Sequence, residues 1–210
     1  MVQDPERGAA RCRCALPAHQ ARLVVVTGGP GAGKTALLEL ARRDLCEHVA
    51  LLPEAASIVY GGGFPRRTLG SNQRAAQRAI FRVQRELERD EVEQGTAGLV
   101  ICDRGTVDAS AYWPGDAAEF WREVGSTPEA ELARYAAVLH LRTPPAPEYN
   151  HRNPLRIESA AEAARIDVRI AAAWAAHPRR FVIDHRRDFL EKVNEAMRII
   201  REEVPPCCRS

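Results

Sequence analysis

The sequence contains little lysine, little net charge and no long apolar run. Of the 30 basic residues among 210, only Lys34 and Lys192 are lysines and the remainder are arginines, so most arginines reflect compositional bias. No apolar run approaches the roughly 20 residues that a membrane helix needs. Residues 1–20 contain arginines but lack the apolar stretch of a secretory signal. A net charge of +2 argues against a broad nucleic-acid or membrane surface.

The remaining composition, 45% hydrophobic and 28% charged, is typical of one globular domain. We expect a cytoplasmic protein with a domain at residues 21–204, a flexible N-terminal tail at 1–20 and a C-terminal tail at 205–210. The sequence leaves the formation of a homodimer open.

The six cysteines are expected to be free thiols, because the chain is long and lacks a secretion signal. They are Cys12, Cys14, Cys46, Cys102, Cys207 and Cys208. The C-x-C pair near one end and the adjacent pair near the other could bind zinc if the two chain ends met. Their spacing fits no compact zinc module, which favours free thiols.

Short apolar runs alternate with helical segments along the chain. Strands are predicted at residues 23–26, 49–52, 98–102, 137–141 and 180–183. Helices are predicted at 34–47, 72–94, 157–176 and 188–202, with an interrupted helical region at 106–136. Loops rich in Gly or Pro are predicted at 60–72 and 143–154. The apolar face of the long helix is assigned to Ala76, Ile80, Val83 and Leu87. This alternation is typical of a three-layer α/β domain with a parallel sheet.

The strongest motif is GGPGAGKT at residues 28–35, which matches G-x-x-x-x-G-K-[ST] between a predicted strand and a predicted helix. Its glycines let successive backbone N–H groups point at one phosphate, and the helix N-terminus adds its dipole. Lys34 would reach the β- and γ-phosphates, and the Thr35 hydroxyl would ligate Mg²⁺. A chance glycine-rich turn is the alternative. The predicted nucleotide-binding residues are Gly28, Gly29, Pro30, Gly31, Ala32, Gly33, Lys34, Thr35 and Ala36.

Two acidic residues follow predicted strands. Asp103 lies at the strand end where α/β domains bind ligands, and it is predicted to hold the Mg²⁺ shell. Glu54 would accept a proton from an attacking hydroxyl if its strand neighbours that of Asp103. For each, the alternative is a structural role at the start of the following helix.

Two groups of polar residues are further candidates. Arg152 and Arg156 follow the fourth predicted strand and could close over transferring phosphates. Gln84 and Arg85, in the long helix, could face a substrate. A solvated, charged face is the alternative for both groups.

Together these segments resemble the P-loop kinase-like AAA family that contains the nicotinamide riboside kinase domain of the bacterial NAD regulator and the translocation-defect proteins. The resemblance covers residues 22–195 and rests on the P-loop and five further segments: Pro53-Glu54-Ala55-Ala56, Phe81-x-x-Gln84, Cys102-Asp103-Arg104-Gly105, Arg156-x-Glu158 and Trp174-x-x-His177-Pro178. More distantly, the chain is similar to deoxynucleoside and thymidylate kinases.

The resemblance implies a five-stranded parallel sheet in the order 2-3-1-4-5, with ATP and Mg²⁺ bound. It implies roles for five residues: Glu54 as general base, Asp103 and Arg104 as an acid-arginine pair, and Arg152 and Arg156 as lid arginines. It also matches residues 184–187 to the segment that lines the adenine.

Two functions follow as expectations. The first is an ATP- and Mg²⁺-dependent kinase that phosphorylates a hydroxyl of a nucleoside-like or other small acceptor. Its expected catalytic residues are Lys34, Glu54, Asp103, Arg104, Arg152 and Arg156, and its expected substrate residues are Glu54, Gln84, Arg85 and Arg104. The second is a regulatory NTPase that binds ATP or GTP and acts through a partner. A nucleic-acid end kinase is disfavoured by the near-neutral charge.

Overall fold

A computed structural model describes residues 12–16, 18–67, 69–144, 159–184 and 188–209. Its core is a parallel sheet in the order β2-β3-β1-β4-β5, which confirms the predicted order. The strands are β1 (Arg22–Thr27), β2 (Val49–Leu52), β3 (Leu99–Asp103), β4 (Ala137–Leu141) and β5 (Arg180–Ile183). The central strands β1, β3 and β4 are buried almost throughout, as expected for a sheet covered on both faces, whereas the edge strands β2 and β5 are only partly buried.

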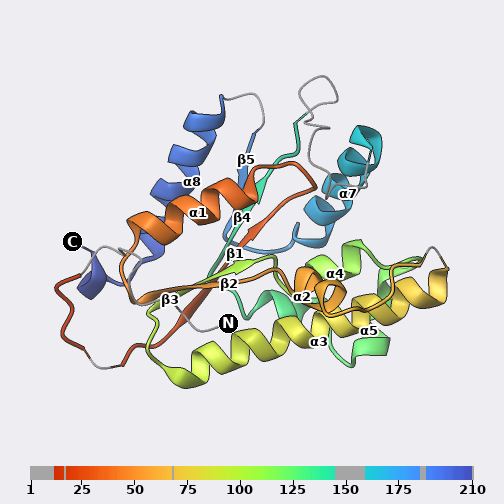
Figure 1. Ribbon diagram of the computed structural model, residues 1–210, viewed down its shortest axis with the longest axis horizontal. Coiled ribbons are helices and arrows are strands. Elements are labelled where there is room, and N and C mark those ends of the chain that lie inside the picture. The colour runs from red at the N-terminus through yellow and green to blue at the C-terminus, as the bar shows by residue number, and fades with distance from the viewer. Residues whose placement is uncertain (1–11, 17, 68, 145–158, 185–187, 210) are drawn as a thin grey trace.

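Helices cover both faces of the sheet (Figure 1). They are α1 (Lys34–Asp44), α2 (Ala55–Gly61), α3 (Gly70–Gln94), α4 (Asp108–Ala111), α5 (Ala117–Val124), α6 (Pro128–Leu132), α7 (Ala160–Ala173) and α8 (Phe189–Glu203), followed by the 3-10 helix η2 (Pro206–Cys208). On one face, Leu37 of α1 and Ile200 of α8 belong to one apolar core. On the other face, Phe81 of α3, Phe120 of α5 and Ile170 of α7 belong to a second. The result is the predicted three-layer α/β fold.

The strand register brings the carboxyl ends of the central strands together. Val26 of β1 pairs with Asp103 of β3, and Thr27 pairs with His140 of β4. The loops that follow these three strands therefore meet at one edge of the sheet. This edge carries the P-loop.

The buried face of the long helix agrees only in part with the predicted one. Ala76 is buried and Leu87 packs against the core, as predicted, whereas Ile80 and Val83 are only partly buried. The residues Phe81, Gln84 and Glu88 are buried as well. The physical reason is a buried polar network, in which Glu88 accepts a hydrogen bond from the Tyr135 hydroxyl at 2.9 Å. Apolar periodicity alone cannot detect a helix face that includes such polar residues.

The loop predicted at residues 60–72 is shorter in the structure. Helix α2 continues to Gly61, and α3 begins at Gly70, two residues before the predicted start. The region at 106–136 forms three short helices, of which α5 and α6 begin at the side-chain caps Asp116 and Thr127.

The described parts of the expected tails contact the domain. The backbone N–H of His19 donates to Gly95 O at 2.7 Å, and Cys208 is buried in the core that faces α1 and α8. In Figure 1, the described residues before β1 and the helix η2 lie at the end of the sheet that is opposite the P-loop. Within the described residues, no helix combines the length and apolar character that crossing a membrane requires.

Candidate functional site

The P-loop leaves the central strand at the carboxyl edge of the sheet, where residues 28–33 connect β1 to α1. Three of its glycines have positive φ: Gly28 (135°), Gly31 (79°) and Gly33 (97°). A Cβ at Gly28 would lie 2.0 Å from the backbone oxygen of Leu141. Glycine is therefore required both for the backbone conformation and for the close approach of β4. A loop of this curvature ahead of a helix N-terminus presents backbone N–H groups to an anion.

Both lysines of the chain contact the P-loop. The ammonium of Lys34 donates to Gly28 O at 2.9 Å and to Gly29 O at 3.2 Å. Lys192, from the first turn of α8, donates to Ala32 O at 2.8 Å. Burial lowers the pKa of each ammonium to about 8. The loop is thus held by two cations, and Lys34 lies where an incoming phosphate could replace its carbonyl partners.

Arg104 connects the P-loop to the end of β2. Its Nε donates to Glu54 Oε1 at 2.6 Å, and its Nη1 donates to Gly28 O at 3.2 Å. The backbone φ of Arg104 is 70°, a conformation that non-glycine residues rarely adopt. Gly28 and Glu54, which precedes α2, fix the guanidinium. Backbone strain that is retained in this way is characteristic of functional sites.

The two acidic residues at this edge differ in their surroundings. Glu54 also accepts a hydrogen bond from the Ser57 hydroxyl at 2.8 Å. Burial disfavours the Glu54 carboxylate, but the Arg104 guanidinium and the Ser57 bond outweigh it and lower the pKa. At Asp103, burial raises the pKa to about 6, although the Lys34 charge opposes this. One buried oxygen of Asp103, Oδ1, has no hydrogen-bond partner among the described residues.

The turn after β3 is held by Asp108, which the sequence analysis did not identify. Its carboxylate accepts hydrogen bonds from the Thr27 hydroxyl, from the backbone N–H of Gly105 at 3.0 Å and from Trp174 Nε1 at 3.0 Å. A Cβ at Gly105 would lie 2.9 Å from the Trp174 ring. The Trp174 segment therefore has a structural role, which is to fix the turn that carries Asp103 and Arg104.

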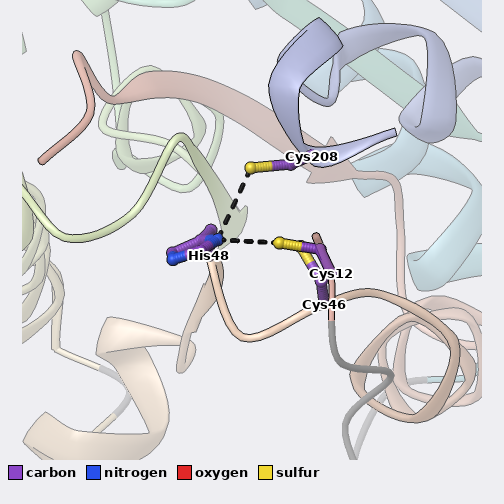
Figure 2. Close-up of side chains that lie close together, drawn as sticks. All are labelled: Cys12, Cys46, His48 and Cys208. Atoms are coloured by element: carbon purple, nitrogen blue, oxygen red, sulfur yellow. Dashed lines mark hydrogen bonds between the residues drawn. The ribbon is translucent and has the colours of Figure 1, made fainter. Parts of the chain in front are cut away.

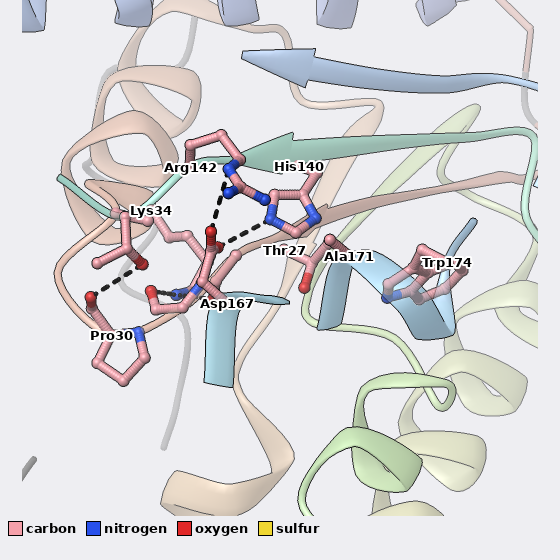
Figure 3. A network of polar contacts seen from close by, with 12 residues as sticks. Thr27, Pro30, Lys34, His140, Arg142, Asp167, Ala171 and Trp174 are labelled. Carbon is pink, nitrogen blue, oxygen red and sulfur yellow. Dashed lines mark hydrogen bonds and ion pairs between the residues drawn. The ribbon is translucent and has the colours of Figure 1, made fainter. Parts of the chain in front are cut away.

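A buried ion cluster ties the P-loop to α7 and β4 (Figure 3). Asp167 of α7 accepts hydrogen bonds from the backbone N–H of Gly29 at 3.0 Å and from His140 Nε2 at 2.8 Å. Its other oxygen lies 3.2 Å from Arg142 Nε. Burial opposes ionisation of Asp167, but these bonds outweigh it and lower the pKa.

Sequence reasoning also missed this cluster, although two signals were present. His140 is a single polar residue within the apolar strand β4, so it needs a buried polar partner. Asp167 falls on the buried face of α7 with Ala163 and Ile170. Each signal indicates a buried polar group, but neither identifies the partner.

Other predicted residues lie as follows. Thr35 and Ala36 are exposed at the start of α1, with Thr35 next to the loop. Gln84 is buried and donates to Glu88 Oε1 at 2.8 Å, and Arg85 forms an ion pair of 2.7 Å with Glu131. These contacts occupy Gln84 and Arg85 within the α3–α6 network.

Arg152 and Arg156 lie outside the described residues, as do residues 185–187 of the segment matched to the adenine. The lid role of the two arginines stays a prediction.

The fold and the loop define a P-loop domain of the α/β three-layer class. The sequence matches the AAA domain family over residues 23–192, and the chain belongs to this family. None of the curated proteins compared with the chain matches its sequence.

Three solved structures illustrate the fold. NadR in complex with NR is 20% identical, with a TM-score of 0.63, and the match covers 89% of this chain and 52% of NadR. NadR in complex with NAD and AMP-PNP is 18% identical, with a TM-score of 0.60 and coverage of 88% and 50%. Thymidylate kinase from Candida albicans is 14% identical, with a TM-score of 0.60 and coverage of 87% and 92%. The chain thus spans about half the length of the NadR structures, and at these identities the likeness concerns the fold.

Proposed function

We propose that this protein is a P-loop kinase that transfers the γ-phosphoryl group of ATP to a hydroxyl of a small, nucleoside-like acceptor. The observation that carries the proposal is the second set of charged groups beside the P-loop. Glu54 and Arg104 form an ion pair of 2.6 Å at the ends of β2 and β3, and Arg104 also contacts Gly28. Binding a nucleotide needs the loop and Lys34 but does not need this pair.

The nucleotide would bind with its phosphates on the P-loop. Backbone N–H groups of the loop and the positive end of α1 would hold the anion, and Lys34 would exchange its carbonyl partners for phosphate oxygens. The Asp167 cluster would fix the conformation of the loop, because the Asp167 carboxylate accepts a hydrogen bond from the backbone N–H of Gly29. ATP is the expected nucleotide, and GTP is the alternative.

Mg²⁺ fits the residues present. Asp103 offers a buried carboxylate oxygen that has no other partner in the described chain, and Thr35 offers a hydroxyl at the start of α1. These are the hard oxygen donors that Mg²⁺ prefers. When bound, the ion would neutralise charge on the transferring phosphoryl group. A cation at Asp103 would also keep its carboxyl ionised at neutral pH.

Glu54 would accept the acceptor's proton. Its lowered pKa keeps it ionised at neutral pH, and Arg104 fixes its orientation through Oε1. Arg104 would also stabilise negative charge near Gly28 during transfer. The NadR complex with NR and the thymidylate kinase structure support a nucleoside-like acceptor.

A regulatory NTPase is the second candidate. One observation favours it. Both oxygens of Glu54 already have partners, Arg104 and Ser57, which is consistent with a structural role of the carboxylate. In that case nucleotide binding would drive contact with a partner, and no acceptor would be needed.

The two candidates differ in a simple assay. ADP release would be measured with Mg²⁺-ATP and a panel of nucleosides, nucleotides and amino sugars, with Lys34→Ala as the inactive control. Release stimulated by one acceptor, with the phosphorylated product detected by mass spectrometry, supports the kinase. Nucleotide binding without stimulation by any acceptor supports the regulatory NTPase.

A further inference from the structure

Seven cysteine and histidine side chains gather at the edge of the sheet opposite the P-loop. They come from residues 12–19, from the turn before β2 and from η2, segments that are far apart in the sequence. They are Cys12, Cys14, His19, Cys46, His48, Cys207 and Cys208. The ligand atoms fall into two groups of four, and within each group they lie within 4.8 Å of one another.

The first group consists of Cys12, Cys46, His48 and Cys208 (Figure 2). Nδ1 of His48 lies 3.1 Å from Cys12 Sγ and 3.5 Å from Cys208 Sγ. Tetrahedral zinc has Zn–S bonds of about 2.3 Å and Zn–N bonds of about 2.0–2.1 Å, which place sulfur and nitrogen about 3.5 Å apart. The spacing thus suits one ion among these four atoms.

The second group consists of Cys14, His19, Cys207 and Cys208. Nε2 of His19 lies 3.4 Å from Cys14 Sγ and 3.4 Å from Cys208 Sγ. The sulfurs of Cys207 and Cys208 are 3.8 Å apart, and tetrahedral zinc places two sulfurs about 3.8 Å apart. The spacing of the second group thus also suits one ion.

Cys208 belongs to both groups, so the number of ligand positions can equal the number that two ions need. Two four-coordinate ions need eight positions, and seven side chains supply them if the Cys208 thiolate bridges both ions. The ring centroids of His19 and His48 are 4.6 Å apart, so the two groups lie side by side. Each ion would then have three thiolates and one imidazole.

The surroundings favour a cation over hydrogen bonds alone. Cys46 and Cys208 are buried, and no disulfide joins the cysteines. Thiols are weak hydrogen-bond partners, so a histidine among them is poorly satisfied. A Cβ at Gly98 would lie 3.1 Å from the His19 ring, so glycine here makes room for its approach.

We propose that the chain binds two Zn²⁺ ions in a Cys₅His₂ cluster bridged by Cys208. Zinc fits because soft thiolates with imidazole in tetrahedral geometry select it. Each thiol that binds releases its proton. Four protein ligands per ion leave no open position, so the ions are structural. They fasten the N-terminal segment and η2 to the turn before β2. Spacing along the sequence could not reveal this, because three distant segments contribute ligands.

The test begins with the metal content of the full chain. The protein would be purified under reducing conditions, dialysed against metal-free buffer and analysed by inductively coupled plasma mass spectrometry. We expect two zinc ions per chain. Titration of the metal-free protein with Co²⁺ should give tetrahedral thiolate–cobalt absorption that ends at two equivalents. Less than one ion per chain, or cobalt spectra without thiolate charge transfer, would overturn the proposal.

Single variants test the shared thiolate. Cys12→Ser disrupts only the first group and Cys14→Ser only the second, so each should retain about one ion. Cys208→Ser should lose metal from both groups. The control is Cys102→Ala, a buried cysteine of β3 outside the cluster, which should retain two ions. If the wild type holds only one ion, and either Cys12→Ser or Cys14→Ser abolishes its binding, the bridge by Cys208 is contradicted. If a variant aggregates, the cobalt titration of the wild type alone decides the number of ions.

Discussion

Asp103→Asn should stabilise the protein in the absence of ligands while it removes a functional charge. Burial raises the pKa of Asp103 to about 6, compared with 3.8 for a free aspartate. The folded pKa lies above the unfolded one, so the folded state binds this proton more tightly. Stability of the wild type therefore falls as the pH rises from about 4 to about 6, and asparagine removes that loss.

The magnitude follows from the two pKa values. Their difference corresponds to about 3 kcal/mol. The new amide would point its own donors toward Lys34 and Arg104, which reduces the gain. We expect Asp103→Asn to be more stable than the wild type by about 1–3 kcal/mol at pH 7 and to approach it below about pH 4.

The assay is urea unfolding at four pH values between 4 and 7, without nucleotide or Mg²⁺. The exposed acid Asp44 supplies the control, because Asp44→Asn should change the free energy of unfolding by no more than about 0.5 kcal/mol. Asp103→Asn should also lose Mg²⁺-dependent turnover. A variant that is less stable than the wild type at every pH, with normal turnover, would show that Asp103 is a structural residue.

Three further substitutions test the loop. Lys34→Ala should weaken Mg²⁺-ATP binding roughly 10- to 100-fold, because a charge-assisted hydrogen bond is lost. Calorimetric titration measures this loss, and circular dichroism checks that the variant is folded. Asp167→Ala leaves buried donors unpaired and should lower the free energy of unfolding by about 2–5 kcal/mol. The control at the exposed neighbour, Val168→Ala, should lower it by no more than about 0.5 kcal/mol. Equal losses in the two variants would refute a stabilising role of the Asp167 cluster. Gly28→Ala should unfold at lower urea than Gly63→Ala, since both positions have positive φ but only Gly28 has a backbone atom in the way; equal midpoints would refute the role of the close approach.

Sequence patterns predicted the sheet and the P-loop because both are local in sequence. The P-loop motif lies directly between the apolar run of β1 and the first helix. The conformation of each of these segments therefore limits the conformation of the next. Parallel strands joined by helices then restrict the topology to a few arrangements. The side chains that support the loop are different. Asp167 and Lys192 lie far along the chain from Gly29 and Ala32, and nothing local to either residue indicates its partner.

The Cys and His cluster shows the same limit at the other edge of the sheet. Reading the cysteines as two pairs at the chain ends omitted Cys46, His19 and His48, because their approach depends on how the segments pack. The ion pair between Glu54 and Arg104 was closer to prediction, since the two residues follow neighbouring strands. Its distance and the positive φ of Arg104 required the structure.

Single-turnover transfer by Glu54→Gln tests the kinase proposal most directly. The γ-phosphoryl group of ATP would be followed onto the acceptor that the panel identifies, in wild type and variant, with nucleotide affinity measured beside it. Glutamine keeps the shape and a partner for Arg104 but cannot accept the proton. We predict that transfer falls by about 10²–10⁴-fold while ATP affinity stays within about threefold. Unchanged transfer, or the absence of any acceptor-dependent rate in the wild type, would contradict the account.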